Sequence, residues 1–90
     1  MRTRKAMGVR VEEMAKILGV DRATLYRWEA DGFFRAHTHV AALVLQWLIA
    51  MPERELQKVA VLVRGRLDKG QTIECQLELH VLMLKQKKSA

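Results

Sequence analysis

A glycine at position 19 separates two stretches of chain that both carry the spacing of amphipathic helices, and this arrangement restricts the possible folds strongly. The apolar residues before it recur at intervals of three and four: Val11, Met14, Ala15 and Leu18. A glycine after such a pattern is typical of a helix C-terminus, because glycine adopts positive φ without steric cost. We therefore expect a short helix that ends at Gly19.

A second helix is expected directly after this glycine. Asp21 is placed to cap it by accepting a hydrogen bond from the backbone N–H of Ala23 or Thr24. The helix should continue until Asp31 and Gly32 break it, so that about three residues join the two helices. The opening segment "RTRKAM" is expected to form one or two turns of a first helix.

The segment "THVAALVLQWLIAM" predicts a further helix that is apolar on two sides. One stripe comprises Val40, Leu43, Val44, Trp47, Leu48 and Met51, and a second comprises Ala42, Leu45 and Ile49. A helix of this kind needs two packing partners. The apolar run from Val40 to Met51 is too short to span a membrane, which requires about 20 residues.

The residues "VEEMAKILGVDRATLYRWEADG" resemble the helix-turn-helix of the Cro and phage-repressor type, the xenobiotic-response-element (XRE) family of regulators. The matching positions are the small Ala15, the turn at Gly19, the apolar Val20 and Leu25, and the pair Trp28-Glu29. "HVAALVLQWL" is similar to the helix that usually follows. The resemblance covers about residues 5 to 51, and it implies a DNA-binding domain over residues 1–52.

In that family the second helix, residues 21–30 here, enters the major groove of DNA. The resemblance implies that Arg22, Ala23 and Arg27 face the bases, while Asp21, Thr24 and Tyr26 lie near phosphates or cap the helix. An arginine fork can donate two hydrogen bonds to guanine, and an alanine methyl can contact the thymine methyl. The alternative is that both arginines belong to a solvated helix face.

Two positions qualify this resemblance. Val11 stands where the family often has a glutamine, and valine cannot donate the hydrogen bond that glutamine supplies. Trp28 is expected in the core and not as a platform for stacking bases.

Two interpretations compete beyond Pro52. "PERELQKVAVLVRGRL" begins as a helix, with Leu56, Val59, Ala60, Val63 and Leu67 on one side. In contrast, "TIECQLELHV" alternates strictly, which predicts a strand with one apolar face. That face would comprise Ile73, Cys75, Leu77, Leu79 and Val81.

A hairpin satisfies the alternation if Asp68, Lys69 and Gly70 form its loop, with Gly70 at positive φ. Val63 then pairs with Cys75 and Val61 with Leu77, and Arg64 lies opposite Glu74 on the other face. We therefore predict an α+β fold, mainly α, in which a helical turn near residues 53–57 precedes a C-terminal β-hairpin. An all-α fold with one or two extra C-terminal helices is the alternative.

A two-stranded ribbon is marginal by itself, so its apolar face needs a partner. Helix-turn-helix proteins of this kind generally read paired half-sites as dimers, which makes residues 53–83 the expected homodimer element. The alternative is a hairpin that completes a monomeric core. Residues 53–90 thus form a C-terminal dimerisation element that ends in the basic tail "KQKKSA".

The net charge of +6, from 16 Lys and Arg against 10 Asp and Glu, suits a polyanionic partner such as DNA or an anionic membrane surface. A lone cysteine, Cys75, and an N-terminus unlike a signal peptide favour the reducing cytoplasm. Cys75 is expected to be a small buried thiol. His37 and His39, with Cys75 or His80, lack the spacing of a zinc site, so no metal or cofactor is expected.

No phosphate-binding loop, nucleophile elbow or acid pair points to an enzyme. The sequence instead predicts a cytoplasmic, sequence-specific DNA-binding regulator, a dimeric repressor of a phage or mobile element that occupies a palindromic operator on double-stranded DNA. "TLYRWEADGFF" also resembles the motif of excisionase-like and MerR-like architectural DNA binders, which is the first alternative. The second is an antitoxin-type module whose C-terminal part binds a toxin.

Overall fold

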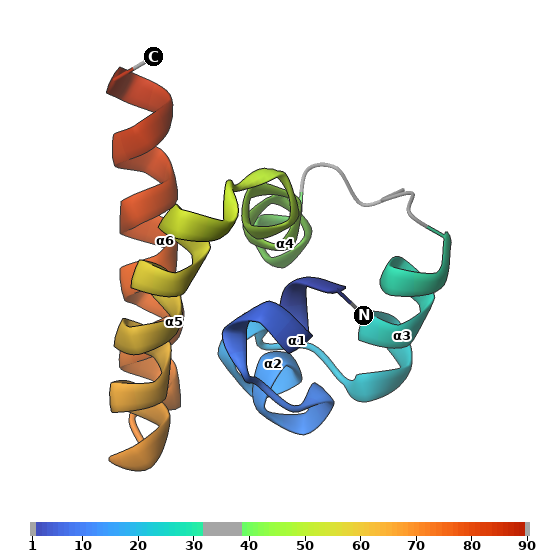
Figure 1. Ribbon diagram of the computed structural model, residues 1–90. Coiled ribbons are helices and arrows are strands. Elements are labelled where there is room, and N and C mark those ends of the chain that lie inside the picture. The colour runs from blue at the N-terminus through green and yellow to red at the C-terminus, as the bar shows by residue number, and fades with distance from the viewer. Residues whose placement is uncertain (1, 32–38, 90) are drawn as a thin grey trace.

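The computed structural model describes residues 2–31 and 39–89, and this part of the chain forms six helices and no strand. They are α1 (Arg2–Met7), α2 (Val11–Leu18), α3 (Arg22–Asp31), α4 (Val40–Ala50), α5 (Glu53–Asp68) and α6 (Thr72–Ser89). Figure 1 shows α5 and α6 as an antiparallel pair at one side of the molecule and α3 at the other, with α1, α2 and α4 between them.

The helices expected in the first half of the chain are present, and the turn between α2 and α3 has the expected chemistry. Gly19 adopts a φ of 74° at the end of α2. The N–H of Val20 donates to the carbonyl of Ala15 at 3.0 Å, and the N–H of Gly19 donates to the carbonyl of Lys16 at 3.2 Å. This pair of bonds is a Schellman motif, which satisfies carbonyls that a helix end leaves without partners.

The core is built from the apolar sides of α2, α3 and α4 together with the inner sides of α5 and α6. Its fully buried members include Met14, Ile17, Leu25, Leu45, Leu48, Val63, Leu79 and Met83. Trp28 is also buried, as expected. Helix α4 packs against α2 and α6, so it has the two partners that its two apolar stripes require.

The predicted C-terminal β-hairpin is wrong, and the all-α alternative describes the fold. Residues 53–68 and 72–89 form the continuous helices α5 and α6. Cys75, Leu79 and Met83 of α6 are buried, whereas Ile73 and Leu77 are more than half exposed. The predicted strand face is therefore divided, one part in the core and the other in solvent.

The error has a physical cause, because a period of two contains a period of four. Apolar residues at every second position also provide apolar residues at every fourth position, and in a helix these lie on one side. The predicted loop is a turn between helices: Gly70 has the expected positive φ, 70°, but the N–H of Gln71 donates to the carbonyl of Arg66 as in a second Schellman motif. Arg64, predicted opposite Glu74, instead binds Glu13 and Asp68.

In the described ranges no helix has both the length and the apolar character needed to cross a membrane.

Cys75 is a buried free thiol, and burial raises its pKa. This agrees with the expectation of a small packed side chain at that position.

The same substitution at two glycines should change stability in opposite directions. Gly19→Ala should lower the free energy of unfolding by about 1–2 kcal/mol, because a Cβ is strained at positive φ. Gly65→Ala should raise it by about 0.5–1 kcal/mol, because Gly65 lies inside α5 and, beyond its chain neighbours and the backbone of its own helix, no atom lies within 4 Å of the new Cβ. Urea denaturation of both variants measures the two effects. Destabilisation by Gly65→Ala would contradict a helical α5.

Candidate nucleic-acid interface

One side of α3 is open to solvent, and it carries the residues that the resemblance assigns to DNA. Arg22, Ala23, Tyr26 and Arg27 are exposed, and they follow one another around the same side of the helix. Asp21 precedes the helix and is also exposed, while Thr24 at the edge of this surface is half-buried. We call these six residues the α3 surface. Ala30 is exposed on the same side but was not among the predicted residues.

Two buried residues on the opposite side of α3 hold this surface outward. Leu25 has no exposed area and Trp28 is buried in the core cluster shared with α2 and α4. The small Ala15 of α2 is also buried, and α2 packs against α3. The apolar contacts that the resemblance expected at the helix crossing are therefore present.

Asp21 caps α3 as predicted, through the second of the two expected amides. Its Oδ1 accepts the backbone N–H of Thr24 at 2.7 Å. This hydrogen bond, with a second from the Thr24 side chain, lowers the pKa of Asp21. The carboxylate therefore stabilises the N-terminus of α3 and does not extend toward a partner.

Both arginines of the α3 surface make contacts within the chain. Nη1 of Arg22 lies 3.2 Å from Oε1 of Glu12, at the start of α2, and both side chains are largely exposed. Arg27 donates a long hydrogen bond of 3.4 Å to the hydroxyl of Thr24. Solvent-exposed contacts of this kind are weak, so both guanidinium groups can exchange them for a ligand at small cost.

Glu12 was not predicted to belong to this site. A hydrogen bond with its own backbone lowers the pKa of Glu12, and the positive charge of Arg22 lowers it further. The ion pair of Glu12 with Arg22 depends on how α2 and α3 cross, so the spacing of residues within one helix could not predict it. A carboxylate in the first turn of α2, where it also favours the helix dipole, was the only available signal.

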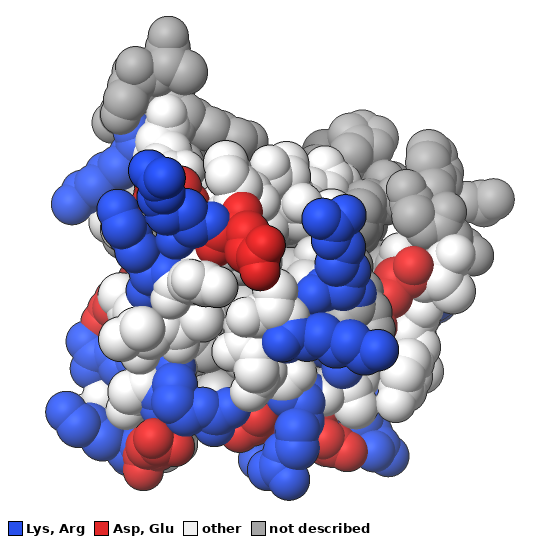
Figure 2. Space-filling view, in the orientation of Figure 1, with Lys and Arg blue, Asp and Glu red and all other residues white. Residues whose placement is uncertain are grey.

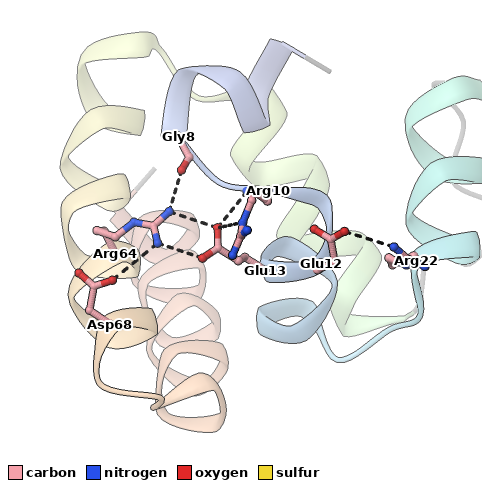
Figure 3. A network of polar contacts seen from close by, with 7 residues as sticks. All are labelled: Gly8, Arg10, Glu12, Glu13, Arg22, Arg64 and Asp68. Atoms are coloured by element: carbon pink, nitrogen blue, oxygen red, sulfur yellow. Dashed lines mark hydrogen bonds and ion pairs between the residues drawn. The ribbon is translucent and has the colours of Figure 1, made fainter.

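The neighbouring acid, Glu13, points the other way and fixes α2 against α5 (Figure 3). Its carboxylate accepts Nη1 of Arg64 at 2.9 Å and Nη2 at 3.2 Å, while Nη2 also donates to the carbonyl of Gly8 at 2.7 Å. The backbone N–H of Arg10 donates to the same carboxylate at 3.0 Å. The Arg64 hydrogen bonds, followed by that of Arg10, lower the pKa of Glu13 to about 2.

One basic residue of α1 joins this helix to α3. Arg4 holds Glu29 of α3 through two hydrogen bonds, Nε to Oε2 at 2.6 Å and Nη2 to Oε1 at 3.0 Å. This bidentate pair joins α1 to α3 and raises the pKa of Arg4. Arg2 and Lys5 of α1 are exposed.

Charges of both signs are distributed over the face seen in Figure 2, where Lys and Arg side chains are interspersed with Asp and Glu. Three ion pairs join separate helices: Arg4–Glu29, Arg22–Glu12 and Arg64–Glu13.

His39, one of the histidines considered for a metal site, caps α4 by accepting the backbone N–H of Ala41 at Nδ1. His37 lies outside the described residues. Val11 is half-buried against the core, in keeping with its departure from glutamine.

No family model, curated protein or solved structure matches this chain in the comparisons made with known proteins.

The Glu13 cluster predicts an acid-sensitive contribution to stability. Because the folded pKa of Glu13, about 2, is below its ordinary value of 4.5, the contribution is complete above pH 4.5 and is lost as the pH falls toward 2. Glu13→Gln should therefore lower the free energy of unfolding at pH 7, and the difference from the unmodified protein should shrink toward pH 2.

Denaturant unfolding at a series of pH values measures this effect. Glu53→Gln, at an exposed position in the first turn of α5, is the matched control and should keep the acid sensitivity of the unmodified protein. An equal dependence on pH in the Glu13→Gln protein would contradict the role assigned to this carboxylate.

Proposed function

We propose that this protein is a sequence-specific DNA-binding transcriptional regulator of the helix-turn-helix type, a dimeric repressor that occupies a palindromic operator. The observation that carries the proposal is the α3 surface. An exposed helix side with two arginines, an alanine and a tyrosine follows a tight turn from α2, and a buried Leu25 and Trp28 hold it outward. Its dimer contact lies in the C-terminal element, residues 53–90, and it acts in the cytoplasm without a cofactor.

The chemistry of the α3 surface suits the edges of base pairs in the major groove. Arg22 near the N-terminus of α3 and Arg27 in its middle can each present a guanidinium fork to O6 and N7 of guanine. The methyl group of Ala23 between them suits the methyl group of thymine. In this proposal Arg22 leaves Glu12 when it binds a base, while Asp21 remains the cap of α3.

Exposed basic residues of α1, with Tyr26 of α3, suit the DNA backbone. Arg2 and Lys5 of α1, and Tyr26 of α3, are exposed and can bind phosphates. Arg4 has a different part, because Glu29 occupies its guanidinium and both side chains are largely buried. Arg4 therefore supports the position of α3 and is not counted among the phosphate contacts.

The affinity for DNA should depend on salt in proportion to the number of phosphates contacted. The logarithm of the binding constant should fall linearly with the logarithm of salt concentration, by about 0.9 for each phosphate. Lys5→Ala should reduce this slope by about 0.9 per subunit, whereas Lys58→Ala, at an exposed position on α5, should leave it unchanged. Fluorescence anisotropy titrations provide the slopes, and binding that ignores salt would count against the proposal.

Substitutions of the two arginines should separate base reading from positioning. Sites selected from random DNA supply the preferred sequence, and Arg22→Ala or Arg27→Ala should then cost about 1–3 kcal/mol of binding and relax one base pair in each half-site. Arg54→Ala, which removes an exposed arginine of α5, is the control and should keep the preference. If both α3 variants retain full discrimination, α3 is not the recognition helix.

A further inference from the structure

Helix α6 has two apolar sides, and α5 and the N-terminal helices cover only one of them. Cys75, Leu79 and Met83 point into the core. A second set of large apolar residues recurs at intervals of four and three on nearly the opposite side of the helix. These residues, which we call the α6 stripe, are Ile73, Leu77, Val81 and Leu84, with exposed fractions of 69%, 60%, 49% and 45%.

The α6 stripe borders an apolar groove between α6 and α5. The groove encloses about 290 Å³ and is lined mainly by Leu62 of α5 with Leu77, Val81 and Leu82 of α6. Glu78 and Lys85 of α6 also line it. A ridge of apolar side chains from another helix therefore has both a stripe to contact and a hollow to enter.

The charges beside the α6 stripe identify the occupant. Glu74 and Lys85 lie about three helical turns apart, so they share one flank of α6, the acid near the N-terminus and the base near the C-terminus. When two helices pair antiparallel, residues on the same flank of each meet. An antiparallel copy of α6 therefore brings Glu74 of each chain beside Lys85 of the other.

The same arrangement matches the apolar residues. With the twofold axis near the middle of the stripe, Leu77 faces Val81 of the second copy, and Ile73 faces Leu84 of the second copy. Such an interface is isologous, because each contact occurs twice and the surface complements itself. A parallel pair would also match the apolar residues, but opposite flanks of the two helices meet in it, so Glu74 would not lie beside Lys85 of the other helix.

We infer that the α6 stripe is the twofold interface of a homodimer in which the α6 helices of two copies pack antiparallel. This interface forms the dimer of the proposed function, and its biological purpose rests on that function. Its geometry is argued from α6 alone. Figure 1 places α6 and α3 on opposite sides of the molecule, so this dimer leaves both α3 surfaces open.

Sedimentation of the full-length protein without DNA tests the interface. The unmodified protein should be dimeric, and Leu77→Glu should weaken the dimer at least about 100-fold, because two carboxylates enter an apolar contact. The fold should persist, since Leu77 is exposed in a single chain, and circular dichroism checks this. Val61→Glu is the matched control: Val61 is 75% exposed on α5 but outside the stripe and groove, so the dimer should remain.

A charge exchange tests the antiparallel register. Glu74→Lys and Lys85→Glu should each weaken the dimer about tenfold, because each places like charges together twice, and the double variant should recover most of the loss. A monomeric unmodified protein, equal loss with Val61→Glu, or no recovery in the double variant would overturn the inference.

Titrations with DNA separate this inference from the proposed function. A dimer that binds no DNA supports the α6 interface and removes the proposed function. A monomer that binds a single half-site supports the DNA function and overturns the interface. A monomer that instead forms a complex with a different protein through Leu77 also overturns it and favours a protein-interaction module.

Discussion

Burial of the apolar side of α2 is the constraint on which the rest of the structure depends. Met14 and Ile17 have no exposed area, and each is worth about 1.5–3 kcal/mol relative to exposure to water. Helices α3, α4 and α6 all pack on this one short helix. Two acids of its first turn also bind neighbouring helices: Glu12 forms an ion pair with Arg22 of α3, and Glu13 forms one with Arg64 of α5 (Figure 3).

The fold of the first half was predictable because local chemistry and hydrophobic spacing agree there. Gly19 and Asp21 end one helix and begin the next through their own backbone and side-chain geometry, with no help from distant residues. The open side of α3 follows directly from the burial of Leu25 and Trp28 three residues apart. The ion pair of Glu12 with Arg22 could not be predicted, since it depends on the angle at which two helices cross.

The second half was predicted wrongly because its apolar residues serve two purposes. In α6, Cys75 and Leu79 face the core while Ile73 and Leu77 face solvent, and together they imitate the alternation of a strand. Monomeric proteins rarely expose a contiguous apolar stripe of this kind to solvent. The alternating pattern thus arises because one set of apolar residues packs in the core and the other belongs to the interface inferred for α6.

Under the proposed function, Glu12 would also affect how fast the protein finds its site on DNA. A free arginine on the recognition helix gains from any phosphate, whereas Arg22 must first give up a carboxylate that lies 3.2 Å away. The exchange is nearly balanced at a phosphate and favourable at a guanine that accepts two hydrogen bonds. In a regulator that works as proposed, residence on random DNA would thereby be shortened more than residence on the target, and a search that samples many wrong positions would proceed more quickly.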